Sequence, residues 1–331
     1  MTGHAIEVRL YAEEPEQGFL PSTGPIHLFS LPEGEGLRVD AGVESGDAVS
    51  PFYDAMVAKV IGYGDTREDA RRRLLTGLEE GALLGLGNNR DFLIDVLERP
   101  AFVAGEATTA FIAENYGDHF SREETPSSVV AAAAVIQHLL ALGRCAQAAP
   151  TVSPELFDWS SRGKSVTVRD YGAPDAPSIV TLEATSAGYY SVQVGGNLHG
   201  FELQAFEETH CELACDGVRE LYHFVEIDDV TLHISDPCHT AVFTDRRRIT
   251  PDAEEAAGGG TVVAPMHGQL LTMEVQPGDT VAQGQRLAVL EAMKMQHEIC
   301  AAAGGTVLEV AASPGTQVAA GDTLVVLAVE D

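Results

Sequence analysis

An internal repeat in residues 261–331 constrains the fold of this chain more than any other feature. With a shift of 37 residues, glycine, proline and apolar positions recur without a gap: Gly268/Gly305, Pro277/Pro314, Gly278/Gly315, Val281/Val318, Gly284/Gly321, Leu287/Leu324, Val289/Val326 and Leu290/Leu327. Each half predicts a strand, a Pro-Gly turn, a short link with a glycine, and a second strand. Two such halves predict two small sheets related by a pseudo-twofold axis and folded as a flattened β-barrel.

The junction between the two halves reads Glu291-Ala292-Met293-Lys294-Met295. Because strands are predicted on both sides, the junction is a hairpin turn with Lys294 at its tip. Such turns favour Gly, Asn or Asp, and methionines on either side of a lysine do not fit that preference. A place where local rules fail is typical of a functional site. Only three of the 20 basic residues are lysines, and a primary amine can be acylated where a guanidinium cannot.

This junction, with Ala264-Pro-Met-His-Gly before it, resembles a biotin carboxyl carrier domain. The resemblance implies covalent biotin on Lys294, with Glu291, Ala292, Met293 and Met295 as the surrounding motif. A lipoyl domain, the nearest alternative, has the same fold and also modifies a hairpin lysine. That family has Asp before the lysine and Ala after it, whereas both neighbours here are Met. The remaining alternative is an ordinary surface lysine.

Residues 1–120 predict an α+β region. We expect strands over 4–11 and Asp54–Gly62, a helix over Asp65–Gly85 capped by Asp65 or Thr66, a helix over Asn89–Leu97, and one short helix within Phe102–Tyr116. Three of its segments, Gly3–Glu13, Phe19–Gly24 and Tyr53–Lys59, resemble the C-terminal subdomain of biotin carboxylase, and the match runs to about residue 116. The resemblance implies that Arg9 is catalytic. It would meet the biotin ureido group and stabilise the enolate formed when N1′ is deprotonated.

The ATP-grasp part of that family has no counterpart here. The resemblance therefore implies that ATP and Mg belong to a missing part of the carboxylase, and that this chain alone is inactive. A fragment, a late-start gene model and a subunit completed by the remainder of the biotin carboxylase domain are open alternatives. We find no glycine-rich phosphate loop, because Gly258–Gly260 lies in a linker and no lysine follows it.

Residues 121–250 predict a linking domain. An alanine-rich helix over Val129–Cys145 is apolar nearly all round and must be buried on most faces. Its most apolar stretch, Val129–Leu142, is too short to cross a bilayer. Eight alternating segments follow: SVTVRD, SIVTLEA, YYSVQV, FELQAF, HCELAC, LYHFVEI, VTLHI and AVFTD. We expect an antiparallel β-barrel wrapped on the helix, then a flexible linker over 251–260, then the carrier domain over 261–331.

The fold class is thus α+β multidomain, and the order of its parts resembles the α subunit of 3-methylcrotonyl-CoA carboxylase. Propionyl- and acetyl-CoA carboxylase α subunits, and a pure carrier or scaffold, are the alternatives. The family carries CO2 as carboxybiotin to a carboxyltransferase β subunit, and biotin protein ligase attaches the biotin. A net charge of −30 excludes nucleic acid and anionic membranes as partners.

Five cysteines without framework spacing predict a cytoplasmic protein. A zinc site can be drawn from His210, Cys211, Cys215, Cys238 and His239. However, the Cys-x3-Cys pair lies in a predicted strand, where residues four apart are distant from one another. We predict no metal site.

Overall fold

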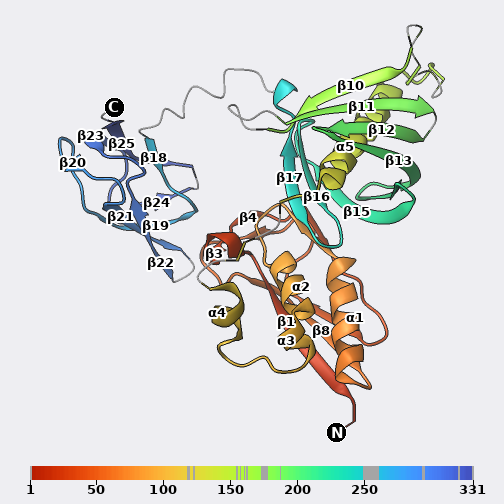
Figure 1. Ribbon diagram of the computed structural model, residues 1–331. Coiled ribbons are helices and arrows are strands. Elements are labelled where there is room, and N and C mark those ends of the chain that lie inside the picture. The colour runs from red at the N-terminus through yellow and green to blue at the C-terminus, as the bar shows by residue number, and fades with distance from the viewer. Residues whose placement is uncertain are drawn as a thin grey trace.

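The computed structural model describes residues 2–117, 120–121, 124–153, 156, 158–159, 161, 163–172, 178–186, 188–248, 261–292, 295–319 and 321–329. Figure 1 shows an N-terminal α+β unit, a curved sheet around a long helix, and a small C-terminal β-unit. This confirms the α+β multidomain class. The boundaries at residues 120, 250 and 260 stay predictions, because 118–119 and 249–260 lie outside the described residues.

The N-terminal unit is built on a three-stranded antiparallel sheet in the order β1 (His4–Tyr11), β8 (Met56–Gly64), β6 (Leu37–Ala41). Helix α1 (Arg67–Glu79) packs on one face of this sheet (Figure 1). The helix begins at a capping box, in which Thr66 and Asp69 each bond the other's backbone N–H. Gly62 permits the close packing, since a Cβ there would lie 2.4 Å from the carbonyl oxygen of Ala70.

One expectation in this unit was wrong. The helix expected to reach Gly85 ends at Glu79, and Gly81 lets the chain turn into strand β9 (Ala82–Leu84), whose three residues are buried. A short buried run does not reveal whether it is helix or strand. The other elements are β2 (Glu13–Glu14), β3 (Leu20–Pro21), β4 (Gly24–Pro25), β5 (Leu28–Ser30), β7 (Ala48–Val49), α2 (Arg90–Glu98), α3 (Pro100–Val103) and α4 (Phe111–Tyr116). The short helix expected within Phe102–Tyr116 is α4, and a further short helix, α3, begins just before that range.

All eight segments predicted for the middle region are strands, and they form one antiparallel sheet in sequence order. They are β10 (Ser165–Asp170), β11 (Ile179–Ser186), β12 (Tyr189–Val194), β13 (Asn197–Phe206), β14 (His210–Cys215), β15 (Val218–Glu226), β16 (Thr231–Ser235) and β17 (Thr240–Thr244). Helix α5 (Ser127–Ala148) lies against the concave face (Figure 1). Its alanines pack on inward-facing side chains such as Val192, Phe201 and Leu232, which are almost fully buried.

We expected an antiparallel barrel wrapped on the helix, and the sheet wraps the helix as an open half-barrel. Among the described strands no ladder joins β10 to β17. The helix fills the interior, so the sheet does not need to close on itself. Asp245 connects the two edges instead: it accepts hydrogen bonds from the Arg169 guanidinium at 3.0 Å and from the Asp170 backbone N–H at 3.2 Å.

Helix α5 is longer than the apolar stretch read from the sequence. With 22 residues it is long and apolar enough to cross a membrane by those two criteria, and half of its most apolar window is buried inside the protein. Its polar side chains have partners within the half-barrel. Gln137 donates to the carbonyl oxygen of Val230 and accepts from the Tyr171 hydroxyl, and His138 lies 2.9 Å from Asp158.

The C-terminal unit reproduces the sequence repeat strand by strand. Its strands are β18 (Thr261–Val263), β19 (Gly268–Met273), β20 (Thr280–Val281), β21 (Arg286–Ala292), β22 (Met295–Cys300), β23 (Gly305–Val310), β24 (Gln317–Val318) and β25 (Thr323–Val329). The bounds of β23, β24 and β25 equal those of β19, β20 and β21 plus the shift of 37. Two four-stranded sheets result, β18-β25-β23-β20 and β22-β21-β19-β24, and exchanging the halves converts one order into the other. The predicted flattened barrel with a pseudo-twofold axis is confirmed.

Candidate functional site

The hairpin at the centre of the repeat holds the predicted biotin motif. Strands β21 and β22 pair as far as Ala292 opposite Met295. Glu291 is half-buried and Ala292 is buried. Met293 and Lys294, which come between the paired residues in sequence, lie outside the described residues, as does the side chain of Met295. The described strands therefore place both ends of a two-residue connection, as expected for a hairpin with Lys294 in its turn.

The strands that lead to this connection are held by cross-strand contacts. The Arg286 guanidinium lies 2.8 Å from a Glu298 carboxylate oxygen and 2.7 Å from one of Glu274, and these hydrogen bonds raise its pKa. Strand β19 pairs with β21 in the same sheet and lies so close to it that a Cβ at Gly268 would be 2.6 Å from the carbonyl oxygen of Glu291. Charge pairing and close backbone packing thus fix the two strands that lead to the turn.

Arg9 lies on the exposed face of the N-terminal sheet, opposite to the face that packs on α1. Alternation places Arg9 on one face of β1, with Leu10 in the core on the other. Its neighbour across the sheet is Lys59. Its guanidinium is 3.6 Å from Glu7, and hydrogen bonding to Tyr11, with a smaller effect of Glu7, raises its pKa. The result is a permanent cation on an open strand.

The backbone at Arg9 is fixed by Asn89, which sequence reasoning missed. The Asn89 side chain accepts a hydrogen bond from the Tyr11 backbone N–H at 2.9 Å and donates to the carbonyl oxygen of Arg9 at 3.2 Å. The Asn89 backbone N–H also donates to the carbonyl oxygen of Tyr11. Asn89 is buried immediately before α2. Its only sequence signal is a polar residue directly before a helix, which is usually read as a cap.

The structure does not join the two candidate regions by a direct polar contact. Among the described residues, no hydrogen bond or ion pair connects Arg9 with Glu291 or Ala292. The C-terminal unit lies beside the N-terminal unit (Figure 1), and a hollow of about 450 Å³ lies between them. The residues that line this hollow are Thr23, Gly24, Val49, Pro51, Phe52, His267, Gln317, Val318, Ala319 and Asp322.

The zinc set considered from the sequence is not brought together. Cys211 is buried opposite Tyr222, and Cys215 is opposite Phe201. His239 is held by Asp236, at 3.1 Å between ring Nδ1 and carboxylate oxygen. Of the described residues, only one group of three offers metal ligands at close range, and it contains Cys215 but no other member of that set.

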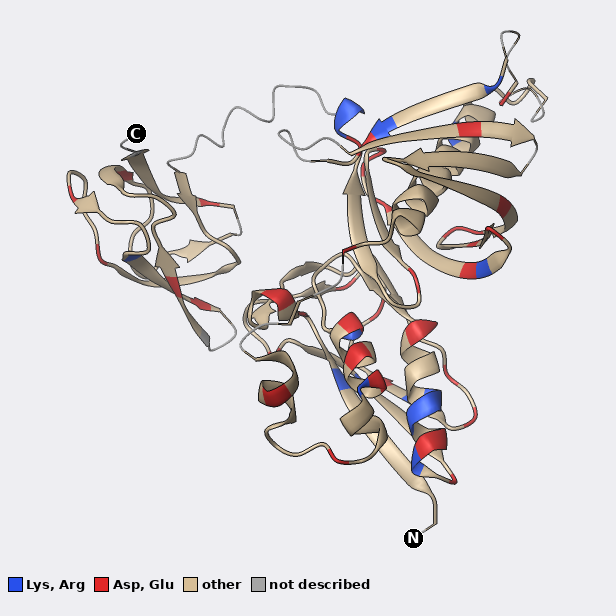
Figure 2. Ribbon diagram, in the orientation of Figure 1, with Lys and Arg blue, Asp and Glu red and all other residues tan. Residues whose placement is uncertain are grey.

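Charge is distributed unevenly over the chain. Figure 2 shows acidic residues in all three parts, while basic residues gather on α1, which carries Arg67, Arg71, Arg72 and Arg73. Arg71 is bound to Glu68 and to the carbonyl oxygen of Leu97, and Arg67 to the carbonyl oxygen of Phe102. These guanidiniums fasten the helix to its surroundings, so we assign them no ligand.

Comparison with known families assigns both ends of the chain. Residues 7–114 match the biotin carboxylase C-terminal domain, and residues 260–327 match the domain of biotin-requiring enzymes. The chain therefore contains both domains. Covalent biotin is the cofactor of the biotin-requiring enzyme domain. ATP and Mg belong to a part of biotin carboxylase other than the C-terminal domain that residues 7–114 match.

Similar proteins extend the match over the whole chain. The propionyl-CoA carboxylase α chain of Ruegeria pomeroyi is 30% identical over 98% of this chain and 51% of its own length. The mitochondrial methylcrotonoyl-CoA carboxylase subunit α of Arabidopsis thaliana is 27% identical over 98% of this chain and 50% of its own. The chain spans about half the length of these relatives. A solved biotin carboxylase subunit of pyruvate carboxylase is 35% identical over 38% of this chain and 27% of its own, with a TM-score of 0.36.

Proposed function

We propose that this chain is the biotin-carrying part of an acyl-CoA carboxylase α subunit. It holds a biotin carboxylase C-terminal domain and a biotin-requiring enzyme domain. The observation that carries the proposal is the repeat hairpin. The two halves of the repeat supply β21 and β22, which pair as far as Ala292 and Met295, and Met293 and Lys294 are the two residues between these in the sequence. Biotin would supply a head group that accepts a carboxyl group at one site and releases it at another.

The residues of the hairpin fit such a group. A swinging prosthetic group requires an amine on a fixed support, clear of the domain core. Pairing continues to Ala292 and Met295, and the Arg286 contacts hold the opposite end of the two strands. Covalent tethering then replaces diffusion by a high local concentration at the carboxylase site and at a carboxyltransferase β subunit.

Arg9 is our proposed catalytic residue on the N-terminal unit. Its exposed guanidinium can face a ligand on the open side of the sheet, and a fixed cation with a planar fork of donors suits an oxygen that gains negative charge. Asn89 would act through the backbone by holding Arg9 and Tyr11 in place, which makes it a positioning residue.

The substrate class that we propose is 3-methylcrotonyl-CoA. Propionyl-CoA is an alternative, since methylcrotonoyl- and propionyl-CoA carboxylase α subunits are comparably similar to this chain. Acetyl-CoA is a further alternative. Biotin protein ligase and a carboxyltransferase β subunit are the proposed partners, with ATP and Mg used by the remainder of the carboxylase. We further propose a cytoplasmic location, which suits the five free cysteines.

A transfer assay tests this function. The biotinylated chain is incubated with a complete biotin carboxylase, ATP and radioactive bicarbonate, and the label retained on the chain is measured. It is then chased either with a methylcrotonyl-type carboxyltransferase and 3-methylcrotonyl-CoA or with a propionyl-type carboxyltransferase and propionyl-CoA. We expect label on the wild-type chain, none on Lys294→Arg, and transfer to 3-methylcrotonyl-CoA. Transfer to propionyl-CoA alone would reassign the substrate, and absence of label on a biotinylated chain would refute the carrier role.

A pure carrier without a role in carboxylation is the second candidate function. To distinguish the two, the upstream half of a biotin carboxylase is joined to this chain, and bicarbonate-dependent ATP cleavage is measured for wild type, Arg9→Met and Arg38→Met. Arg38 is an exposed arginine on strand β6 of the same sheet and serves as the matched control. We expect Arg9→Met alone to reduce the rate, by about 10²-fold or more. Equal rates for the three chains would favour the pure carrier.

A further inference from the structure

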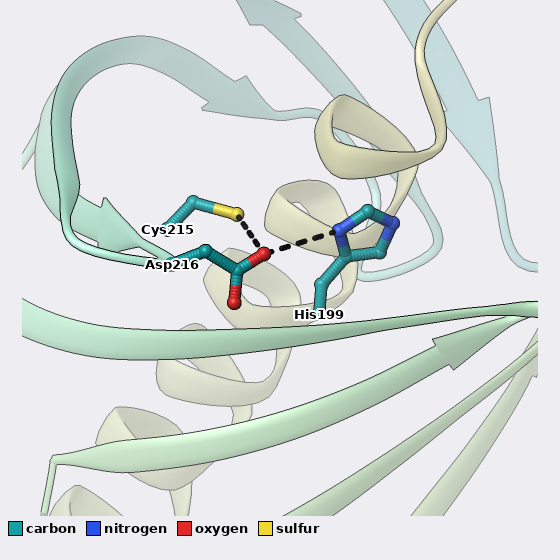
Figure 3. Close-up of side chains that lie close together, drawn as sticks. All are labelled: His199, Cys215 and Asp216. Carbon is teal, nitrogen blue, oxygen red and sulfur yellow. Dashed lines mark hydrogen bonds and ion pairs between the residues drawn. The ribbon is translucent and has the colours of Figure 1, made fainter.

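The half-barrel contains a cluster of metal-ligating side chains that the proposed carboxylation does not use. His199 on β13, Cys215 at the end of β14 and Asp216 in the following turn each offer one ligand atom, and these atoms lie within 4.8 Å of one another (Figure 3). The Asp216 Oδ2 atom is 4.0 Å from His199 Nδ1 and 3.9 Å from Cys215 Sγ. Imidazole, thiol and carboxylate thus converge on one point.

Strand pairing explains why these residues meet. In the β13–β14 ladder, Phe201 is opposite Cys215, and the Asp216 backbone N–H donates to the carbonyl oxygen of Gly200 at 3.0 Å. His199 therefore lies next to the turn that follows β14. Asp216 has a φ of 49° and Gly217 one of 89°, the left-handed pair that a two-residue Asp-Gly hairpin requires. The turn therefore fixes the position of the Asp216 backbone from which the carboxylate extends.

Hydrogen bonds from atoms outside the cluster orient two of the three ligands, Asp216 and His199. The Gly200 backbone N–H donates to Asp216 Oδ1 at 3.2 Å, which leaves Oδ2 for the cluster. Ser127 Oγ lies 2.9 Å from His199 Nε2, and Asn197 donates to the same hydroxyl at 3.2 Å. When Nε2 carries the proton, Nδ1 presents its lone pair to the cluster. Histidines that bind metals are commonly held in this way through the other ring nitrogen.

We propose that His199, Cys215 and Asp216 form a zinc site. Zinc prefers sulfur and nitrogen donors together with a carboxylate, and three protein ligands leave a fourth position for water or a further ligand. Zinc bond lengths of about 2.0–2.3 Å set donor separations of roughly 3.3–3.7 Å, so the two separations from Asp216 Oδ2, 4.0 Å to His199 and 3.9 Å to Cys215, must contract by a few tenths of an ångström. Asp216 can provide this movement, because its side chain is 65% exposed while that of His199 is 14% exposed.

The site would connect parts of the half-barrel that are distant in sequence. The metal would bind β13 to the turn after β14, and through Ser127 to the first turn of α5. It would therefore stabilise the half-barrel, which lies in the sequence between the biotin carboxylase C-terminal domain and the biotin-requiring enzyme domain. This departs from our sequence-based prediction of no metal site, which weighed cysteines and histidines between His210 and His239 and did not include His199 or Asp216. His199 precedes Cys215 by 16 residues and gives no such signal.

Metal titration of the full chain tests the site. Chain stripped with EDTA is titrated with ZnCl₂ against a chelating dye, and with CoCl₂ while absorbance is recorded. We expect one tight equivalent per chain, a thiolate-to-cobalt charge-transfer band and a higher melting temperature with zinc. Cys215→Ser should remove the band, Asp216→Asn should weaken binding at least tenfold, and Ser127→Ala by about 10–100-fold. Cys238→Ser, which changes an exposed cysteine outside the cluster, should match wild type.

Asp216→Asn keeps the test decisive if the buried Cys215 is required for folding. Asparagine also adopts the left-handed turn conformation, so this variant retains the hairpin. Far-ultraviolet circular dichroism confirms the fold of each variant. The proposal is overturned if wild type takes up no stoichiometric zinc, or if folded Asp216→Asn binds zinc and cobalt as wild type does.

Discussion

Arg90 is the residue that most directly joins the N-terminal unit to the half-barrel. Its side chain is 1% exposed and donates to the carbonyl oxygens of Asp236 and Pro237 in the half-barrel and of Leu78 and Glu79 at the end of α1. It also pairs with Asp91 at 2.9 Å. A buried guanidinium with this many acceptors is satisfied only when both units are in place.

We expect Arg90→Met to destabilise the protein by about 3 kcal/mol, because it leaves a buried carboxylate and several carbonyl oxygens without their donor. The measurement is the midpoint of urea unfolding. The control is Arg38→Met, which removes an exposed pair with Asp40 and should change stability by less than about 1 kcal/mol. Equal midpoints for the two variants would show that the Arg90 contacts do not hold the units together.

For single residues, the sequence pointed to candidate sites where a residue belongs to a recognisable motif. It did not point to residues whose partners are distant in the sequence. Lys294 and Arg9 stood out because their neighbours formed recognisable patterns. Asn89 and Arg90 did not, since their partners are 80 and 146 residues away. His199 and Asp216 escaped as partners of Cys215 for a related reason: strand register, which no local pattern gives, brings them together.

Among the elements, the β21–β22 hairpin depends on the close approach of strand β19, which pairs with β21 in the same sheet. Periodicity and repeat predicted its strands correctly, as they did the eight strands of the half-barrel. They failed for β9, a buried run of three residues, and did not show that the half-barrel stays open, which depends on how α5 fills its interior. Strand existence is a local property, whereas sheet closure depends on tertiary packing.

We expect Gly268→Ala to loosen this hairpin, because the new Cβ would lie 2.6 Å from the carbonyl oxygen of Glu291 and overpacking costs about 1–3 kcal/mol. Hydrogen exchange of peptides from β21 and β22 should accelerate by about an order of magnitude. Gly304→Ala is the control, since its Cβ would meet Val281 at an ordinary 3.5 Å. Unchanged exchange in Gly268→Ala would mean that β19 adjusts without cost.

For the whole molecule, the interface between the N-terminal unit and the half-barrel contains histidines. His223 Nε2 lies 3.0 Å from the carbonyl oxygen of Glu80, and the rings of His27 and His233 are 5.9 Å apart. Burial lowers the pKa of His223 and of His233, with smaller effects of neighbouring groups. The neutral imidazoles therefore belong to the docked state. Sequence gave no indication of this interface, because it is formed by strands from two different units.

We expect acid to weaken this interface. A folded pKa below the unfolded value of about 6.5 gives stability that is complete above that pH and declines as pH falls through it toward the folded pKa. The melting temperature should thus fall between about pH 7 and pH 5. His223→Gln keeps a donor for Glu80 but cannot titrate, so its melting temperature should depend less on pH. His4→Gln, at the exposed start of β1, should follow wild type. Parallel curves for all three proteins would contradict this account.

The central claim is that the repeat forms a carrier whose hairpin lysine is the single site of biotinylation. The most direct test is the intact mass of the chain, with avidin capture, after treatment with biotin protein ligase, biotin and ATP. We predict one biotin on wild type and on the controls Lys59→Arg and Lys164→Arg, which change the other two lysines, and none on Lys294→Arg. A Lys294→Arg chain that gains biotin mass and binds avidin would contradict the claim.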